Sequence, residues 1–190
     1  EPVRIIQRGY PPVPGATILA KRRYVREQLD HLRRLLMFEP RGHDDMYGVL
    51  LVEPTLPGAD IAVLFMHNEG YSTMCGHGII AVTKVALETG LLPLVAPETR
   101  VRIDTPAGLV TAHARVSGGE VQSVYFHNVP SFVLARDETV EVPGLGRVRY
   151  DIAFGGAFYA YVDAADVAVR CTPDDFRPLI AKGMAVKRAV

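Results

Sequence analysis

The sequence predicts an α/β protein of the α+β type, which combines a mostly antiparallel sheet with a buried helix. Three observations predict this class. Short runs of apolar and β-branched residues are separated by turns rich in Gly and Pro. Residues 76–89 have helical length and are apolar on most sides, and residues 17–36 show the spacing of an amphipathic helix.

The first predicted elements are a strand at residues 3–6 and a helix that begins near Thr17. Three prolines follow the strand and break it, because proline lacks a backbone donor and fixes φ. Thr17 suits the N-cap position. Apolar residues then fall on one helical face: Ile18, Val25, Leu29, Leu32 and Leu36. Acidic residues lie among the basic ones on the other faces, which indicates a solvated surface.

A β-hairpin is predicted at residues 49–52 and 61–66, which flank a turn containing two prolines and a glycine. The second strand leads into the loop before Cys75, and the helix over residues 76–89 follows and ends at Gly90. A helix that is apolar on most sides is usually buried. We therefore expect its N-terminus, at Cys75, to open into a dry, partly enclosed pocket.

The second half of the chain predicts an antiparallel meander followed by a helix. Gly and Pro turns separate most of its strands, which we expect at residues 101–105, 109–116, 121–129, 131–135, 138–142, 146–153 and 157–163. Gly155 and Gly156 mark either a close backbone approach to the pocket or a bulge. Pro173 is expected to start the final helix.

Composition indicates a globular protein without a polyanionic partner. The 190 residues are 48% hydrophobic, and 21 basic residues balance 21 acidic ones. We therefore expect no nucleic-acid partner. No apolar run approaches the roughly 18 residues of a membrane span, and the start lacks a signal-peptide pattern, so we expect no membrane partner. The two cysteines, Cys75 and Cys171, do not make a disulfide framework, which favours a reducing, cytoplasmic setting.

The chemistry of the chain is concentrated in residues 70–81, where a cysteine, a histidine and three glycines meet at a loop-to-helix junction. A helix N-terminus offers backbone N–H groups without helical partners and the positive end of the helix dipole. These groups favour an anion and stabilise a thiolate. Our hypothesis is an active-site cysteine beside a carboxylate-binding pocket.

Residue types alone leave four interpretations of Cys75 open. A Cys/His hydrolase needs a histidine and a third residue to orient it, and a redox thiol normally has a resolving partner such as Cys-x-x-Cys, which is absent. A thiol that takes a proton from the α-carbon of a bound amino acid needs only a tuned pKa and an anion pocket. Alternatively, Cys75 is a buried small hydrophobe.

Other singled-out residues have plainer interpretations. Residues 37–48 place Arg41, His43, Asp44 and Asp45 in a surface loop or at the rim of the site. Consecutive residues do not easily converge on one ion, so we expect no metal site. Cys171 is expected in the core, and His113 and His127 as ordinary strand residues.

Five stretches resemble, in the expected order, segments of the proline racemase family. The signature-like stretch is MCGHG at residues 74–78. The others are LAKRRY at 19–24, FEPRGHDDMYG at 38–48, DTPAGLV at 104–110 and DIAFGGAFY at 151–159. The resemblance therefore extends over nearly the whole chain.

This resemblance implies a diaminopimelate-epimerase-like fold, a curved, mostly antiparallel sheet around a central buried helix. A complete protein of the family has two such domains, with the active site between them and no cofactor. Cys75 is implied as the catalytic base, and Gly76 and His77 as ligands of the substrate carboxylate. The implied substrate is a small molecule of the proline or hydroxyproline type, and the implied assembly is a homodimer.

The ends of the sequence suggest a fragment. It opens at Glu1 without an initiator Met and stops at Val190 inside a predicted helix. We therefore expect residues 1–170 to form an N-terminal domain truncated at its start. Residues 171–190 would then begin a helical linker towards a missing second domain.

The family includes proline racemases, 4-hydroxyproline epimerases and trans-3-hydroxy-L-proline dehydratases. The first two carry a second catalytic cysteine in the opposite domain, whereas the dehydratases have threonine there. Residues 67–73 (HNEGYST) and 21–24 (KRRY) resemble the dehydratase version. The favoured function is thus dehydration of trans-3-hydroxy-L-proline to pyrroline-2-carboxylate by proton abstraction at Cys75. The alternatives are a two-cysteine racemase or epimerase, and a non-catalytic module that binds proline-like amino acids.

Overall fold

The computed structural model describes residues 2–190, so Glu1, where the predicted N-terminal domain starts, lies outside the described part. Packing divides the chain into two compact units, one ending at Val129 and the other running from Pro130 to Val190. The division into a domain over residues 1–170 and a linker over 171–190 stays a prediction, because packing units and the domains of a complete protein need not share boundaries.

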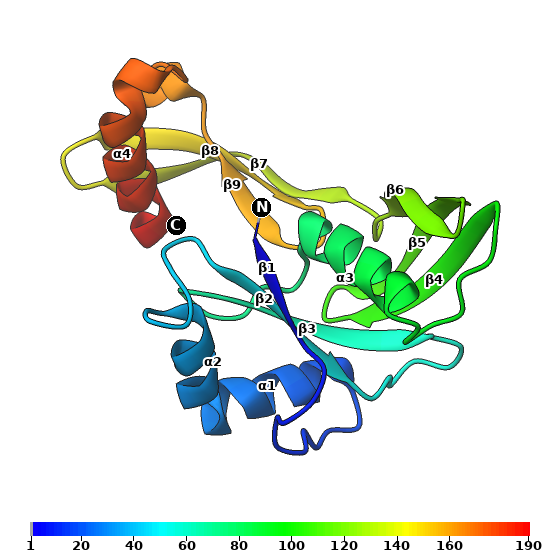
Figure 1. Ribbon diagram of the computed structural model, residues 1–190. Helices are drawn as coiled ribbons and strands as arrows, with labels where there is room; N and C mark the ends of the chain where they lie inside the picture. Colours follow the sequence, from blue (N-terminus) through cyan, green and yellow to red (C-terminus); the bar gives the residue numbers. More distant parts are fainter. Residues whose placement is uncertain (1) are drawn as a thin grey trace. The chain divides into compact units, whose positions relative to one another are not determined.

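The first unit is a mixed α/β structure built on a six-stranded sheet in the order β1 to β6. The sheet curls around α3, and α1 and α2 lie on its other face (Figure 1). The predicted α/β class is therefore confirmed. The elements are β1 (Val3–Ile6), α1 (Ile18–Gln28), α2 (Asp30–Met37), β2 (Tyr47–Val52), β3 (Ile61–His67), α3 (Gly76–Glu88), β4 (Glu98–Thr105), β5 (Gly108–Ser117) and β6 (Glu120–His127).

Strand β3 is buried on both of its faces, because successive side chains of a strand point to opposite sides. Ile61, Val63 and Phe65 pack with α3 and the inward side chains of β4 and β5, which together we call the α3 core. Ala62, Leu64 and Met66 pack with α1 and α2 in the α1–α2 core. A run of six apolar residues without a polar alternation is what such a strand requires.

Two of the strand pairings are parallel, and each is produced by a helical crossover. β1 pairs with β2 in parallel after α1 and α2, and β3 pairs with β4 in parallel after α3. β2 and β3 run antiparallel, so the second crossover starts from a reversed strand. Right-handed crossovers in the same sheet order must then use opposite faces. This explains why α1 and α2 cover one face and α3 the other.

The helical region after Thr17 differs from the single helix that we predicted. The N-cap is confirmed, since the hydroxyl of Thr17 accepts a hydrogen bond from the N–H of Ala20 at 3.1 Å. The helix then breaks at Leu29, whose ψ of 14° is not helical, and α2 restarts at Asp30. Asp30 uses its carboxylate to bind Arg33 one turn later, so the break places a charged pair inside the α1–α2 layer.

The second unit has its own three-stranded sheet. Our prediction that these strands continue the meander of the first unit is therefore wrong. Phe132–Val142 form one strand with register shifts near Ala135, whereas we predicted two separate strands at residues 131–135 and 138–142. The elements are β7 (Phe132–Val142), β8 (Gly146–Phe154), β9 (Phe158–Tyr161), η1 (Ala164–Val167), η2 (Pro173–Asp175) and α4 (Phe176–Ala189). Its core contains Val142, Val148 and Val186.

A buried carboxylate fixes the loop between β2 and β3. The side chain of Asp104 is fully buried, and its Oδ2 accepts hydrogen bonds from the Thr55 N–H, the Thr55 hydroxyl and the Leu56 N–H at 2.8, 2.8 and 3.2 Å. Thr55 Oγ1 also accepts from the N–H of Ile18 at 3.1 Å. Asp104 thereby joins β4, this loop and the start of α1.

We predict that Asp104→Ala lowers the free energy of unfolding of the full-length protein by about 2–3 kcal/mol, because three donors lose their acceptor. Asp44→Ala is the matched control, since Asp44 is exposed, and it should change the free energy by less than about 0.5 kcal/mol. Denaturant titration followed by circular dichroism measures both. Equal midpoints for the two variants would contradict the role assigned to Asp104.

Candidate functional site

Cys75 is the N-cap residue of α3, at the point where the loop from β3 becomes helical. Its backbone is extended, with φ −147° and ψ 109°, and its carbonyl accepts the first helical hydrogen bond from Ile79 at 3.0 Å. The side chain is 7% exposed and lies at the edge of the α3 core. Cys75 therefore lies at the end of α3 where the first N–H groups lack helical acceptors and the helix dipole is positive.

The glycines after Cys75 make room for the thiol and the neighbouring rings. A Cβ placed on Gly78 would lie 3.2 Å from Cys75 Sγ and 3.0 Å from the buried ring of Phe65. A Cβ on Gly76 would lie 3.2 Å from the ring of Phe126 on β6. The thiol therefore lies over the first turn of α3, in space that a side chain at residue 78 would contest.

His77 lies beside two further rings at the same end of the sheet. Its imidazole meets the ring of Tyr47 edge-on, with centroids 4.9 Å apart, and Tyr47 lies 5.6 Å from His67. Tyr47 and His67 are direct partners in the β2–β3 hairpin. The Glu69 N–H donates to Nδ1 of His67 at 3.2 Å. Neither Tyr47 nor His67 was assigned to the site from the sequence, because the predicted hairpin at residues 49–52 and 61–66 contained neither of them.

The loop over residues 37–46 is tied to the residues that precede Cys75. Asn68 Nδ2 donates to the carbonyls of Met37 and His43 at 2.9 and 3.0 Å, and its Oδ1 accepts from the N–H of Met46 at 2.9 Å. His43 and Asp44 themselves are exposed. Sequence reasoning missed Asn68, whose position between a strand end and a glycine was the available signal.

Two further residues singled out from the sequence are Cys171 and His113. Cys171 is exposed, so its predicted place in the core is wrong, and it forms no disulfide with Cys75. His113 lies on β5, stacked on Tyr125 at 4.8 Å and bonded to Glu98 at 2.9 Å. The hydrogen bond from His113 holds the pKa of Glu98 below its usual value.

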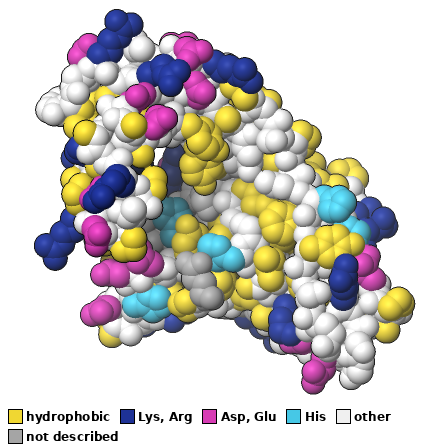
Figure 2. Space-filling model, turned by 90° about the horizontal axis from the view of Figure 1, so that it is seen from above, with side chains coloured by type: hydrophobic (Ala, Val, Ile, Leu, Met, Phe, Trp, Pro, Cys, Tyr) yellow, Lys and Arg dark blue, Asp and Glu magenta, His cyan; other side chains and the backbone are white. Residues whose placement is uncertain are grey.

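On the face shown in Figure 2, Lys and Arg side chains lie among Asp and Glu side chains and do not gather into a patch of one sign. Between residues 2 and 190, no three His, Cys, Asp or Glu side chains are grouped to hold a metal ion. None of the described helices is long and apolar enough to span a bilayer.

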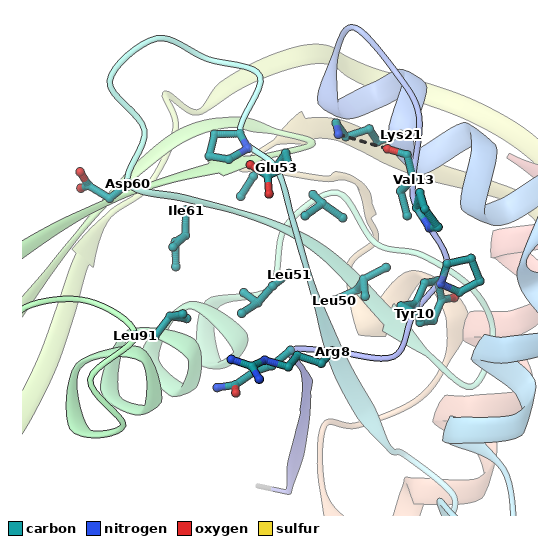
Figure 3. Close-up of a pocket in the computed structure, with 16 residues that line it drawn as sticks. Arg8, Tyr10, Val13, Lys21, Leu50, Leu51, Glu53, Asp60, Ile61 and Leu91 are labelled. Atoms are coloured by element: carbon teal, nitrogen blue, oxygen red, sulfur yellow. Dashed lines mark hydrogen bonds between the residues drawn. The ribbon is translucent and has the colours of Figure 1, made fainter.

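A cavity of about 590 Å³ lies in the first unit, but it contains none of the predicted site residues. It lies where β2 ends and β3 begins, which is the opposite end of these strands from the Cys75 loop (Figure 3). Lys21 lines it and donates from Nζ to the carbonyl of Val13 at 3.2 Å, and Asp60 is engaged by the N–H of Arg102 at 2.7 Å. The Cys75 end of the sheet thus remains the candidate site.

Comparison with known proteins connects this geometry to one family. The model of a family described as proline racemase matches residues 1–190. The human trans-3-hydroxy-L-proline dehydratase is 53% identical over 196 residues, which cover 100% of this chain and 55% of the human protein. The chain therefore spans about half the length of the relatives that it matches.

Two solved structures share the fold at lower identity. A probable proline racemase from Agrobacterium radiobacter K84, with bound carbonate, has a TM-score of 0.90 and 32% identity, over 98% of this chain and 55% of the other. A hydroxyproline epimerase from Agrobacterium vitis, with bound trans-4-hydroxy-L-proline, has a TM-score of 0.89 and 33% identity, over 97% and 55% of the two chains.

We predict that Asn68→Ala lowers the free energy of unfolding by about 1–3 kcal/mol and speeds hydrogen exchange at the Met46 amide, because that amide loses its acceptor. Asn68→Asp is the matched variant: it keeps an acceptor for Met46 but loses the donors to Met37 and His43. Its Met46 amide should stay protected in exchange measured by mass spectrometry. Equal exchange in both variants would show that Asn68 does not hold this loop.

Proposed function

Because the chain belongs to the proline racemase family, we propose that it forms part of an enzyme that dehydrates trans-3-hydroxy-L-proline to pyrroline-2-carboxylate without a cofactor. The observation that carries this proposal is the identity of 53% to the human dehydratase, against 32–33% to the racemase and epimerase structures. The position of Cys75 at the N-terminus of α3 supplies a thiol suited to the reaction.

In the proposed reaction, the Cys75 thiolate takes the proton from the α-carbon. The electrons of the broken C–H bond form a double bond to C3, and the 3-hydroxyl leaves as water after it gains a proton. The product is an enamine, which tautomerises to the imine form of pyrroline-2-carboxylate. The α-proton is weakly acidic, so the pocket must neutralise the carboxylate and stabilise the developing negative charge.

The residues next to Cys75 are proposed to hold the substrate carboxylate. Gly76 contributes a backbone N–H in the first turn of α3, where anions bind readily. His77 contributes an exposed imidazole whose edge-on contact with Tyr47 limits its rotation. Together these groups would orient the α-carbon towards Sγ.

The complete protein is proposed to have two diaminopimelate-epimerase-like domains, each a curved sheet around a central helix, and to act as a homodimer. Residues 1–170 would belong to the first domain, and residues 171–190 would lead towards the second. The second domain would supply the residue opposite Cys75. The proposal of a second domain is supported by the solved relatives, of which the chain covers 55%.

A racemase or epimerase is the second candidate, and it is favoured by the fold shared with two solved structures at TM-scores of 0.90 and 0.89. The two functions can be distinguished by incubating the full-length protein in D₂O with trans-3-hydroxy-L-proline, L-proline or trans-4-hydroxy-L-proline. Nuclear magnetic resonance then identifies the products of each incubation. A dehydratase converts only the first to pyrroline-2-carboxylate. Deuterium at the α-carbon with inversion of either of the others indicates a racemase or epimerase. Binding without exchange or water loss indicates a non-catalytic module.

We predict that Cys75→Ser lowers turnover of trans-3-hydroxy-L-proline by about 10²–10⁴-fold or more, because a hydroxyl is a much weaker proton acceptor than a thiolate. Cys171→Ser is the matched control and should keep the activity of the unmodified protein, since Cys171 is exposed and outside the proposed site. Steady-state product formation measures both variants. Substantial activity in Cys75→Ser would refute the proposed base.

We predict that His77→Ala raises KM by about 10–100-fold with a smaller change in kcat, because a hydrogen bond to the charged carboxylate is lost in ground state and transition state alike. His31→Ala is the control, since His31 is an exposed residue of α2. A fall confined to kcat in His77→Ala would instead assign His77 to the proton transfer.

A further inference from the structure

The chain between β3 and Cys75 crosses from one packing layer of the first unit to the other. Tyr71 is 7% exposed and belongs to the α1–α2 core, whereas Cys75 belongs to the α3 core. Cys75 lies four positions after Tyr71, and four residues of extended chain span at most about 14 Å. Contacts that hold residues 67–71 in place therefore limit the possible positions of the Cys75 thiol.

Arg33, on α2, fixes the start of this crossing segment. Its side chain is 7% exposed, and its Nη1 donates to the carbonyl of His67 at 2.8 Å and to the carbonyl of Asn68. The guanidinium also lies over the ring of Tyr71, 5.7 Å from its centroid. One side chain thus contacts three of the residues that lead from β3 towards Cys75.

The carboxylate of Asp30 holds Arg33 in this orientation. Asp30 accepts from Nε of Arg33 at 2.6 Å and from Nη2 at 3.0 Å, which leaves Nη1 directed at the two carbonyls. The hydrogen bond raises the pKa of Arg33 and lowers the pKa of Asp30. The planar guanidinium binds the carboxylate and the backbone carbonyls at the same time, and a lysine ammonium group cannot reproduce this geometry.

Arg22, on α1, holds the other end of the same segment. Its Nη2 donates to the carbonyl of Tyr71, and the hydroxyl of Tyr71 reaches the carbonyl of Val25 at 3.4 Å. Guanidinium groups from both α1 and α2 therefore donate hydrogen bonds to the backbone of residues 67–71, which we call the crossing segment.

We propose that Arg33 is a positioning residue for Cys75, which acts through the backbone of residues 67–71 and does not touch the substrate. This inference rests on the proposed role of Cys75 as the catalytic base. α3 is anchored by its own apolar face, and Arg33 sets the path by which the chain enters its first turn. The path decides how Sγ lies against the N–H groups of that turn.

The test is Arg33→Lys in the full-length protein. Both it and its control also carry Cys171→Ser, so that Cys75 is the one cysteine left among the described residues. Arg34→Lys is the matched control, because Arg34 is the exposed neighbour on the same helix. The rate of Cys75 alkylation by iodoacetamide is measured against pH, with mass spectrometry assigning the modified residue. Thermal unfolding and the steady-state constants are measured on the same samples.

Arg33→Lys is expected to raise the apparent pKa of alkylation by about 0.5–1 unit, the size of a lost helix N-terminal contribution. It should also lower kcat by about 10–100-fold with little change in KM, as a misplaced reacting group does. Arg34→Lys should change neither quantity. An alkylation profile that stays unchanged while only the melting temperature falls would overturn the proposal and leave Arg33 a purely structural residue.

Alkylation needs no substrate, so it separates this inference from the proposed function. Failure of the unmodified protein to dehydrate its substrate would refute the function, while the alkylation profiles would still decide the role of Arg33. Should Arg33→Lys not fold, Asp30→Asn replaces it, since it keeps the guanidinium and removes the counter-charge that orients it. A shift of the alkylation profile in the same direction supports the proposal, and an unchanged profile overturns it.

Discussion

The burial of β3 on both faces is the constraint on which the first unit depends. A strand with apolar side chains on both sides needs a packing layer on each, and the chain provides α1 and α2 on one face and α3 on the other. The two parallel pairings follow from the crossovers that carry these helices. The same strand ends at His67, so the chain that leaves it must pass around the end of the sheet to start α3. The candidate site lies on that passage.

Buried and half-buried polar side chains hold the loops at the two ends of β3. At its start, Asp104 accepts hydrogen bonds from the backbone of residues 55 and 56, and Thr55 in turn binds the first turn of α1. At its end, Arg33 and Asn68 bind carbonyls of the crossing segment and of the loop over residues 37–46. Such groups are costly to bury unless they are hydrogen-bonded, so each one specifies a loop position as well as stabilising it. These hydrogen bonds thereby define the loop positions at both ends of the apolar strand β3.

Local features could be predicted from the sequence, and features set by distant partners could not. The N-cap at Thr17, the hairpin of β2 and β3 and the helix start at Cys75 depend on neighbouring residues, and the structure confirms these elements. The break at Leu29 and the grip of Arg33 depend on contacts with another part of the chain, which periodicity does not encode. The separate sheet of β7 to β9 was missed because alternation shows a strand but not its partner. Cys171 was misplaced because its hydrophobic character was used without its tertiary surroundings.

The close approach of Gly78 to Cys75 also bears on how the thiol responds to oxidants. Sγ faces the first turn of α3 and the ring of Phe65, where even a methyl group would crowd its neighbours. An oxygen added to sulfur as a sulfenic or sulfinic acid must therefore point through the small exposed part of the residue. Mild oxidation would then place a polar group beside Gly76 and His77, the residues proposed to hold the substrate carboxylate. The packing that places the thiol thus also limits the directions in which an oxidised sulfur can extend.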